Sequence, residues 1–226
     1  SKLLSQQKIV VILGPTASGK SDLGIKLAKK FNGEIISADS RQVYRRMNIG
    51  TGKITKKEQQ LVKHYLLDVA NPKKIFTVSD FKKLGEKSLK DIENKNKIPF
   101  IVGGTGFYID VLLGRASVVE VPPNKKLRKH LDKLTAEKLF EKLRTLDSER
   151  AKTIDPKNKR RLVRALEIIT MTGRKVLKTE ISIISIHHDR IVLILGIKVL
   201  KEKLVKKITK RLDSRLKQGM IKEVKN

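Results

Sequence analysis

An eight-residue segment near the N-terminus constrains the fold of this chain most strongly. Residues 14–21 match the pattern Gly-x-x-x-x-Gly-Lys-Ser/Thr in full. An apolar run over residues 8–13 precedes the segment and a helical pattern over residues 20–31 follows it, which is the strand–turn–helix context that a phosphate-binding loop requires. In such a loop the backbone N–H groups and the helix N-terminus point at a phosphate. A chance match in a glycine turn is the alternative, and the context argues against it.

The segment predicts a binding site for a di- or triphosphate, but does not by itself indicate ATP. Lys20 is expected to reach the outer phosphate, and the Ser21 hydroxyl is expected to hold Mg²⁺, the cofactor that the loop implies. The residues expected to bind the phosphates are Gly14, Pro15, Thr16, Ala17, Ser18, Gly19, Lys20 and Ser21.

Short apolar runs alternate with helical patterns along the chain, which predicts a parallel sheet. The expected fold class is α/β, a P-loop NTPase-like parallel-sheet core flanked by helices, with a helical insertion domain. We expect the first part of the core at 1–123, the insertion at 124–185 and the return to the core at 186–226, where a helical pattern is cut off and the chain is expected to be truncated. The predicted strands are 8–13, 34–37, 65–69, 99–102 and 191–197; the predicted helices are 20–31, 80–94, 125–150, 157–172 and 200–217; a long loop is expected at 38–53.

The usual nucleotide-hydrolysis residues are not evident in the sequence. In P-loop kinases and phosphohydrolases an apolar strand ends in an Asp that organises Mg²⁺. Here the best candidate strand, 98–102, ends in Gly-Gly-Thr-Gly. Asp39 and Asp68 lie nearer to the ends of other strands, and Asp39 is expected beside the phosphate loop because residues past the carboxyl ends of parallel strands line the site. An Asx turn or a helix cap is the structural alternative for Asp39.

The chain is strongly basic. Among its 226 residues, 52 Lys and Arg stand against 23 Asp and Glu, a net charge of +29, and residues 124–226 carry +18 of it. Such a surplus favours a polyanionic partner such as a nucleic acid, although a generally lysine-coated surface is the alternative. The lack of cysteine excludes disulfide scaffolds and thiolate sites. No apolar run is long enough to cross a membrane, so we expect no membrane contact. We also expect a cytoplasmic protein and a monomer.

Five segments together resemble the tRNA dimethylallyltransferase family, also called tRNA isopentenyltransferases. They are residues 14–21, 37–44, 47–51, 102–108 and 155–167, and their order and spacing agree with that family over nearly the whole chain. The resemblance implies transfer of a dimethylallyl group from dimethylallyl diphosphate to the exocyclic amine of the adenosine just 3′ of the anticodon, at position 37 of the tRNA. Pyrophosphate is the other product. Against the family the regions 114–124 and 179–190 look short.

The resemblance also implies roles for individual residues. Asp39 matches the general base, Ser21 a contact to the diphosphate or its Mg²⁺, and Arg211 a contact to the pyrophosphate. From spacing alone Arg211 is one member of an ordinary solvated stripe with Lys203, Lys207 and Arg215. Contacts to the tRNA anticodon stem-loop are implied for Asp39, Ser40, Arg41, Gln42, Thr105, Arg128, Arg160, Arg161, Leu162, Val163 and Arg164.

Three other functions compete with this interpretation. A P-loop kinase would explain the phosphate loop and the sheet, but not the basic second half or the Gly-Gly-Thr-Gly segment. An adenylate isopentenyltransferase would act on a free nucleotide, against which Arg160, Arg161 and Arg164 argue because their spacing makes one basic helix face. A nucleic-acid-binding protein without activity would leave Lys20 and Asp39 without a role.

Overall fold

The computed structural model describes residues 7–116, 118, 121–176 and 190–225. The chain forms two compact units. The first unit combines Ser1–Arg115 with Ser182–Asn226, and the second is Ala116–Ile181. The insertion expected at 124–185 overlaps this second unit.

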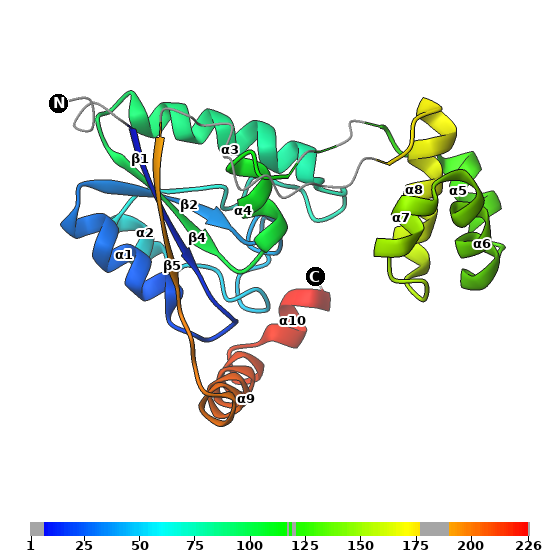
Figure 1. Ribbon diagram of the computed structural model, residues 1–226. Coiled ribbons are helices and arrows are strands. Elements are labelled where there is room, and N and C mark those ends of the chain that lie inside the picture. The colour runs from blue at the N-terminus through cyan, green and yellow to red at the C-terminus, as the bar shows by residue number, and fades with distance from the viewer. Residues whose placement is uncertain (1–6, 117, 119–120, 177–189, 226) are drawn as a thin grey trace. The chain divides into compact units, whose positions relative to one another are not determined.

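The first unit is built on a five-stranded sheet whose paired strands, among the described residues, all run parallel in the order β3-β2-β4-β1-β5 (Figure 1). β1, β2 and β4 are rich in Ile, Val and Phe because parallel strands in the middle of a sheet are covered on both faces. The strands are β1 (Gln7–Leu13), β2 (Gly33–Ala38), β3 (His64–Tyr65), β4 (Ile98–Gly103) and β5 (Arg190–Gly196).

Helices cover both faces of this sheet, with α1 on one face and α3 and α4 on the other (Figure 1). Alternate strand residues separate into two cores, as the period of two in a strand requires. Val11 packs on the α3–α4 side, whereas Ile12 packs on the α1 side. The helices of this unit are α1 (Lys20–Lys30), α2 (Lys56–Leu61), α3 (Val78–Glu93), α4 (Gly106–Leu112), α9 (Lys201–Lys217) and α10 (Met220–Lys225).

The pairing of β2 with β4 brings two functional loops together at the carboxyl edge of the sheet. Ala38 lies opposite Gly103 in the register of this pair. A Cβ at Gly103 would collide with the Ala38 backbone, so this position requires glycine. The loop after β2, the loop after β4 and the phosphate loop after β1 therefore open at the same edge.

The predicted parallel α/β core is confirmed, but some of its elements differ from the prediction. The strand predicted at 65–69 is wrong beyond Tyr65, because Leu66 and Asp68 have left-handed backbones, with φ of 63° and 57°, that end the pairing. The short helices α2 and α4 were not predicted. α2 starts at a capping box in which Thr55 and Glu58 satisfy each other's backbone N–H groups.

The described part of the second unit is a bundle of four helices, α5 (Lys125–Leu131), α6 (Ala136–Leu146), α7 (Ser148–Thr153) and α8 (Lys159–Thr172). The single helix predicted at 125–150 is therefore wrong, because two polar residues inside it cap new helices. Thr135 accepts a hydrogen bond from the Lys138 N–H, and Asp147 accepts one from the Arg150 N–H. In neither unit does the described part of the chain contain a helix that is long and apolar enough to cross a membrane.

A buried carboxylate holds the second unit together. Glu167 on α8 is fully buried, and its oxygens accept hydrogen bonds from Arg128, Arg164 and the Asn124 N–H at 2.6–2.8 Å. Burial by itself raises the pKa of Glu167, but the two arginines and the N–H outweigh it and lower this pKa to about 2. The carboxylate thus joins the start of α5 to α8 as an ion.

Glu167→Gln should destabilise the second unit by roughly 2–3 kcal/mol at neutral pH, because it leaves two arginines without their buried counter-charge. The folded pKa of about 2 lies below the ordinary value of 4.5. The carboxylate therefore stabilises the native state above about pH 4.5, and this contribution is lost as the pH falls through the folded pKa. Chemical unfolding of the wild type between pH 6 and pH 2 should show this loss, and the variant should lack it.

Glu141→Gln provides a matched control on α6. Glu141 pairs with Arg144 at 2.7 Å, but both side chains are more than half exposed. This variant should change the free energy of unfolding by less than about 0.5 kcal/mol. Equal effects of the two substitutions would contradict the structural role of Glu167.

Candidate active site

The phosphate loop joins β1 to the first turn of α1. Gly19 has φ 88° and directly precedes Lys20, the first residue of α1, so the loop turns into the helix through a backbone that glycine adopts freely. The Ser18 Oγ is buried and receives no hydrogen bond from any residue that the structure describes. A buried hydroxyl without a protein partner, beside free N–H groups of a helix N-terminus, fits a loop made to hold an anion.

Lys20 is half-buried at the end of this loop, where α1 begins. Its Nζ donates a hydrogen bond to the Pro15 carbonyl at 3.1 Å, which keeps the amine over the loop. Burial lowers the pKa of Lys20, the Asp39 carboxylate opposes this change, and Arg211 adds to it. Lys20 therefore already interacts electrostatically with the two residues that the family resemblance singled out.

Asp39 follows β2 and faces the same pocket. Its Oδ1 accepts hydrogen bonds from the N–H groups of Arg41 at 2.8 Å and Gln42 at 3.3 Å, so the Asx turn considered from the sequence is present. Its Oδ2 receives no hydrogen bond from the described residues and remains open to a ligand. The turn is fixed to the β4 loop because the Ser40 N–H donates to the Thr105 hydroxyl at 3.2 Å. The turn thus orients the carboxylate without using both of its oxygens.

Two arginines from α9 complete the pocket. Arg211 and Arg215 lie four residues apart and therefore on one face of the helix. The Nη1 of Arg215 donates to the Gly50 carbonyl at 3.1 Å. Burial and the nearby Arg211 lower the pKa of Arg215, which Asp39 opposes, yet a guanidinium stays protonated in proteins.

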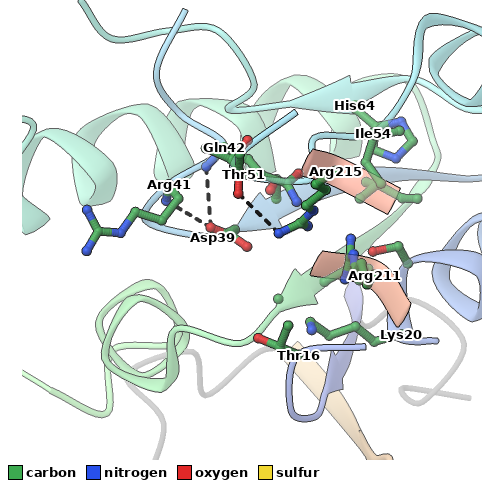
Figure 2. Close-up of a pocket in the computed structure, with 16 residues that line it drawn as sticks. Thr16, Lys20, Asp39, Arg41, Gln42, Thr51, Ile54, His64, Arg211 and Arg215 are labelled. Carbon is green, nitrogen blue, oxygen red and sulfur yellow. Dashed lines mark hydrogen bonds between the residues drawn. The ribbon is translucent and has the colours of Figure 1, made fainter. Parts of the chain in front are cut away.

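The pocket enclosed by these segments has a volume of about 230 Å³ (Figure 2). Figure 2 shows Lys20, Asp39, Arg211 and Arg215 around one hollow. Among the residues that the structure describes, four cationic side chains and one carboxylate line it, the fourth cation being Arg41. Such a site attracts a small anion with several negative charges, and the carboxylate can accept a proton from a neutral group held next to it.

A model of the IPP transferase family matches residues 42–226. The chain belongs to this family. Two relatives named tRNA dimethylallyltransferase are similar over almost its full length. The one from Anoxybacillus flavithermus is 40% identical over 222 residues, covering 97% of this chain and 70% of that protein. The one from Staphylococcus epidermidis is 42% identical over 225 residues, covering 96% of this chain and 68% of that protein.

Solved structures of IPP transferases and related enzymes share this fold. A tRNA delta(2)-isopentenylpyrophosphate transferase from Staphylococcus epidermidis is 39% identical with a TM-score of 0.64, and the match covers 97% of this chain and 73% of that one. A eukaryotic dimethylallyltransferase, captured in crystals acting on tRNA, is 31% identical with a TM-score of 0.80, covering 97% of this chain and 55% of that one.

Several residues that the family resemblance linked to tRNA have structural partners in this IPP transferase. In the first unit, Gln42 is buried and its Nε2 donates to the Gly52 carbonyl at 3.2 Å, whereas Arg41 is exposed. Thr105 holds the Asp39 turn, as described above. Gln42 and Thr105 thus support the loops of the pocket, and Arg41 extends from its rim.

In the second unit the predicted tRNA contacts divide into exposed and internal residues. Arg160 and Arg161 are exposed at the start of α8. Leu162 and Val163 are buried in the helical core. Arg128 and Arg164 pair with Glu167 and keep about a third of their side-chain surface exposed. On α8 the exposed basic face therefore consists mainly of Arg160 and Arg161, since Arg164, which the spacing also placed on it, pairs with Glu167.

A divalent cation would fit this pocket only together with a ligand. The described residues contain no cluster of three acidic or histidine side chains that could cage a metal by themselves. Ser21 is among the residues that line the pocket, and Mg²⁺ usually combines one or two protein oxygens with phosphate oxygens. Ser21 fits that mode.

Three features of the pocket are not evident from the sequence. Arg215 belongs by spacing to a solvated stripe, and its i, i+4 relation to Arg211 is the one signal for its place in the pocket. His64 lines the pocket, and burial lowers its pKa so that the neutral imidazole is favoured. Glu223 binds the loop that carries Gly50, and no local pattern distinguishes it from other helix-surface carboxylates.

Gly52→Ala is expected to weaken binding of inorganic pyrophosphate by roughly tenfold or more, since the loss of one hydrogen bond to a charged group is of this size. A Cβ at Gly52 would collide with the Arg215 guanidinium and lie 2.6 Å from an Arg211 terminal nitrogen. The position also has φ 59°, which disfavours alanine. Isothermal titration calorimetry of both proteins with pyrophosphate measures the effect.

Gly173→Ala is the control, because Gly173 has φ 65°, a Cβ there meets nothing within 4 Å, and the position lies in the second unit. It should bind pyrophosphate like the wild type. Wild-type affinity in Gly52→Ala would remove the two arginines from the anion site.

Proposed function

We propose that this chain is a tRNA prenyltransferase that moves a dimethylallyl group from dimethylallyl diphosphate to the exocyclic amine of the adenosine 3′ of the anticodon. One observation carries the proposal: a phosphate loop, two arginines of α9 and an oriented carboxylate line a single pocket in a member of the IPP transferase family. Relatives of about 40% identity are named tRNA dimethylallyltransferase.

The diphosphate would bind to the phosphate loop and to the cations around it. Residues 14–21 offer backbone N–H groups, and Lys20, Arg211 and Arg215 offer charged donors. Mg²⁺ bound with the diphosphate beside Ser21 would neutralise part of its charge. After β4 the chain continues with Gly-Thr-Gly and not with the Asp that organises Mg²⁺ in P-loop kinases, which favours a prenyl diphosphate over ATP as the substrate.

The transfer forms two bonds, carbon–nitrogen and oxygen–hydrogen, and breaks two, carbon–oxygen and nitrogen–hydrogen. The lone pair of the adenine amine attacks the allylic carbon, and the carbon–oxygen bond to the diphosphate breaks with its electron pair leaving on pyrophosphate. The amine loses a proton as the carbon–nitrogen bond forms, and the Asp39 carboxylate accepts it through the oxygen that the Asx turn leaves open. Lys20 and the arginines stabilise the charge that develops on the leaving group.

The tRNA would contact both units. The target base has to leave its stack to reach a carboxylate inside a pocket. Arg41 at the rim and the exposed Arg160 and Arg161 on α8 offer charges to the phosphate backbone. Residues 124–226, which include helices of both units, carry +18 of the net charge, and this positive charge supports contacts of both units with the RNA backbone.

Nucleoside mass spectrometry of undermodified tRNA tests the reaction. One tube holds the protein, Mg²⁺ and dimethylallyl diphosphate, and a second tube holds ATP in place of the prenyl donor. Prenylated adenosine in the first tube alone is expected. ATP consumption in the second tube without prenylation in the first would favour a kinase instead.

Asp39→Asn should lower kcat at least about a hundredfold, the usual contribution of a positioned general base. The amide retains the shape of the Asx turn, so tRNA affinity should stay within about twofold of the wild type. Single-turnover kinetics and filter binding separate the two quantities. A wild-type rate would exclude Asp39 as the base.

Arg161→Ala should weaken tRNA binding and reduce the slope of log affinity against log salt by about one. The cause is the loss of one phosphate contact and its released counterion. Arg144→Ala is the control. Arg144 is an exposed residue of α6 that pairs with Glu141 on the same helix, so its loss should leave the slope unchanged. An unaltered slope for Arg161→Ala would mean that the start of α8 does not bind RNA.

A further inference from the structure

The helix that carries both pocket arginines is not anchored by apolar packing. No residue of α9 or α10 is buried against the described part of the protein. The apolar side chains along α9, among them Ile208, Leu212 and Leu216, are each more than 40% exposed. Polar contacts must therefore decide where Arg211 and Arg215 lie.

Glu223 on α10 makes the most concentrated set of such contacts. Its Oε1 accepts the N–H groups of Asn48 at 2.6 Å and Ile49 at 2.9 Å, and its Oε2 accepts the Gly50 N–H at 2.8 Å. Burial raises the pKa of Glu223, but these three N–H groups and Lys53 outweigh it and lower the pKa, so the group is a carboxylate at neutral pH. Three charge-assisted bonds to consecutive N–H groups fix both the position and the direction of the side chain.

The same loop also holds Arg215 from its other side. The Gly50 N–H binds Glu223, while the Gly50 carbonyl accepts the hydrogen bond of Arg215. Gly52 lies against the guanidinium of Arg215, and its carbonyl accepts the Gln42 amide. One peptide segment thus connects α10, the arginine face of α9 and the turn that carries Asp39.

The loop is itself fixed to the core. Lys53 has only 3% of its side chain exposed, and its Nζ donates to the Tyr44 carbonyl at 2.6 Å, to Asn48 Oδ1 at 3.0 Å and to Asp68 Oδ1 at 2.6 Å. A helix end that binds such a loop acquires a defined place relative to the phosphate loop.

We propose that Glu223 is a positioning residue for the diphosphate site: by binding the N–H groups of residues 48–50, it holds α9 so that Arg211 and Arg215 face the same anion as Lys20. The inference rests on the proposed function, because it takes the anion to be the diphosphate of the prenyl donor. Glu223 itself touches neither substrate. It acts through the two arginines, and this distinguishes it from a residue that only stabilises the fold.

Glu223→Gln removes the charge and leaves one amide oxygen for three N–H groups. We expect the dissociation constant for inorganic pyrophosphate with Mg²⁺ to rise roughly tenfold, as for coupled residues in one hydrogen-bonded network. The KM for dimethylallyl diphosphate should rise in parallel, with a smaller change in kcat. Glu202→Gln is the matched control, since it removes an exposed carboxylate from the first turn of α9, and it should bind pyrophosphate like the wild type.

A double-mutant cycle separates positioning from a purely structural role. In the Arg211→Ala, Arg215→Ala background, Glu223→Gln should have no further effect on pyrophosphate affinity. An equal loss of affinity in both backgrounds would overturn the inference, as would wild-type affinity of Glu223→Gln alone. If Glu223→Gln does not fold, Glu223→Asp replaces it; its shorter side chain keeps the charge and should raise the dissociation constant by an intermediate factor, whereas an unchanged constant would overturn the inference.

Different results would overturn the proposed function and the role of Glu223. A wild-type protein that does not bind pyrophosphate would overturn the proposed function and this inference together. A wild-type protein that binds pyrophosphate and prenylates tRNA, with Glu223→Gln unchanged in both, would overturn only the role of Glu223.

Discussion

The placement of β4 between β1 and β2 decides where the functional groups of the first unit lie. In parallel strands the carboxyl ends meet at one edge, and the register sets Ala38 directly opposite Gly103. The turn with Asp39, the loop with Thr105 and the phosphate loop consequently open into the same pocket. Without a side chain at Gly103, β4 approaches β2 closely enough for the Thr105 hydroxyl to bind the turn.

The two units differ in whether their clustered charges are balanced by partners of opposite sign. In the second unit the buried Glu167 is neutralised by Arg128 and Arg164, which makes a closed structural site. In the first unit the pocket contains more cations than the single carboxylate can compensate. Like charges held together at Arg211 and Arg215 lower the stability of the empty arrangement and raise its affinity for an anion, as preorganised sites do.

The loop at residues 48–53 connects these features through backbone groups. Its N–H groups bind Glu223, its carbonyls bind Arg215 and Gln42, and Lys53 fixes it to the core. A loop whose donors and acceptors are divided in this way can transmit the position of α10 to the pocket mainly through polar contacts. This explains how α9 can present a functional face while its apolar side chains remain exposed.

The sequence by itself determined the phosphate loop, the parallel α/β core and the candidate carboxylate Asp39, because these depend on motifs and periodicities among adjacent residues. It also predicted a helical insertion at 124–185, a range that overlaps the second compact unit. It did not determine the break at Asp147 or the end of β3 at Tyr65, since capping and left-handed turns compete with periodicity over single residues. Only the tertiary structure decided that Arg215 lines the pocket and that Glu223 binds the loop after β2. Local spacing places Arg211 and Arg215 on one face of α9. It does not show what that face meets, because this depends on contacts with residues far away in the chain.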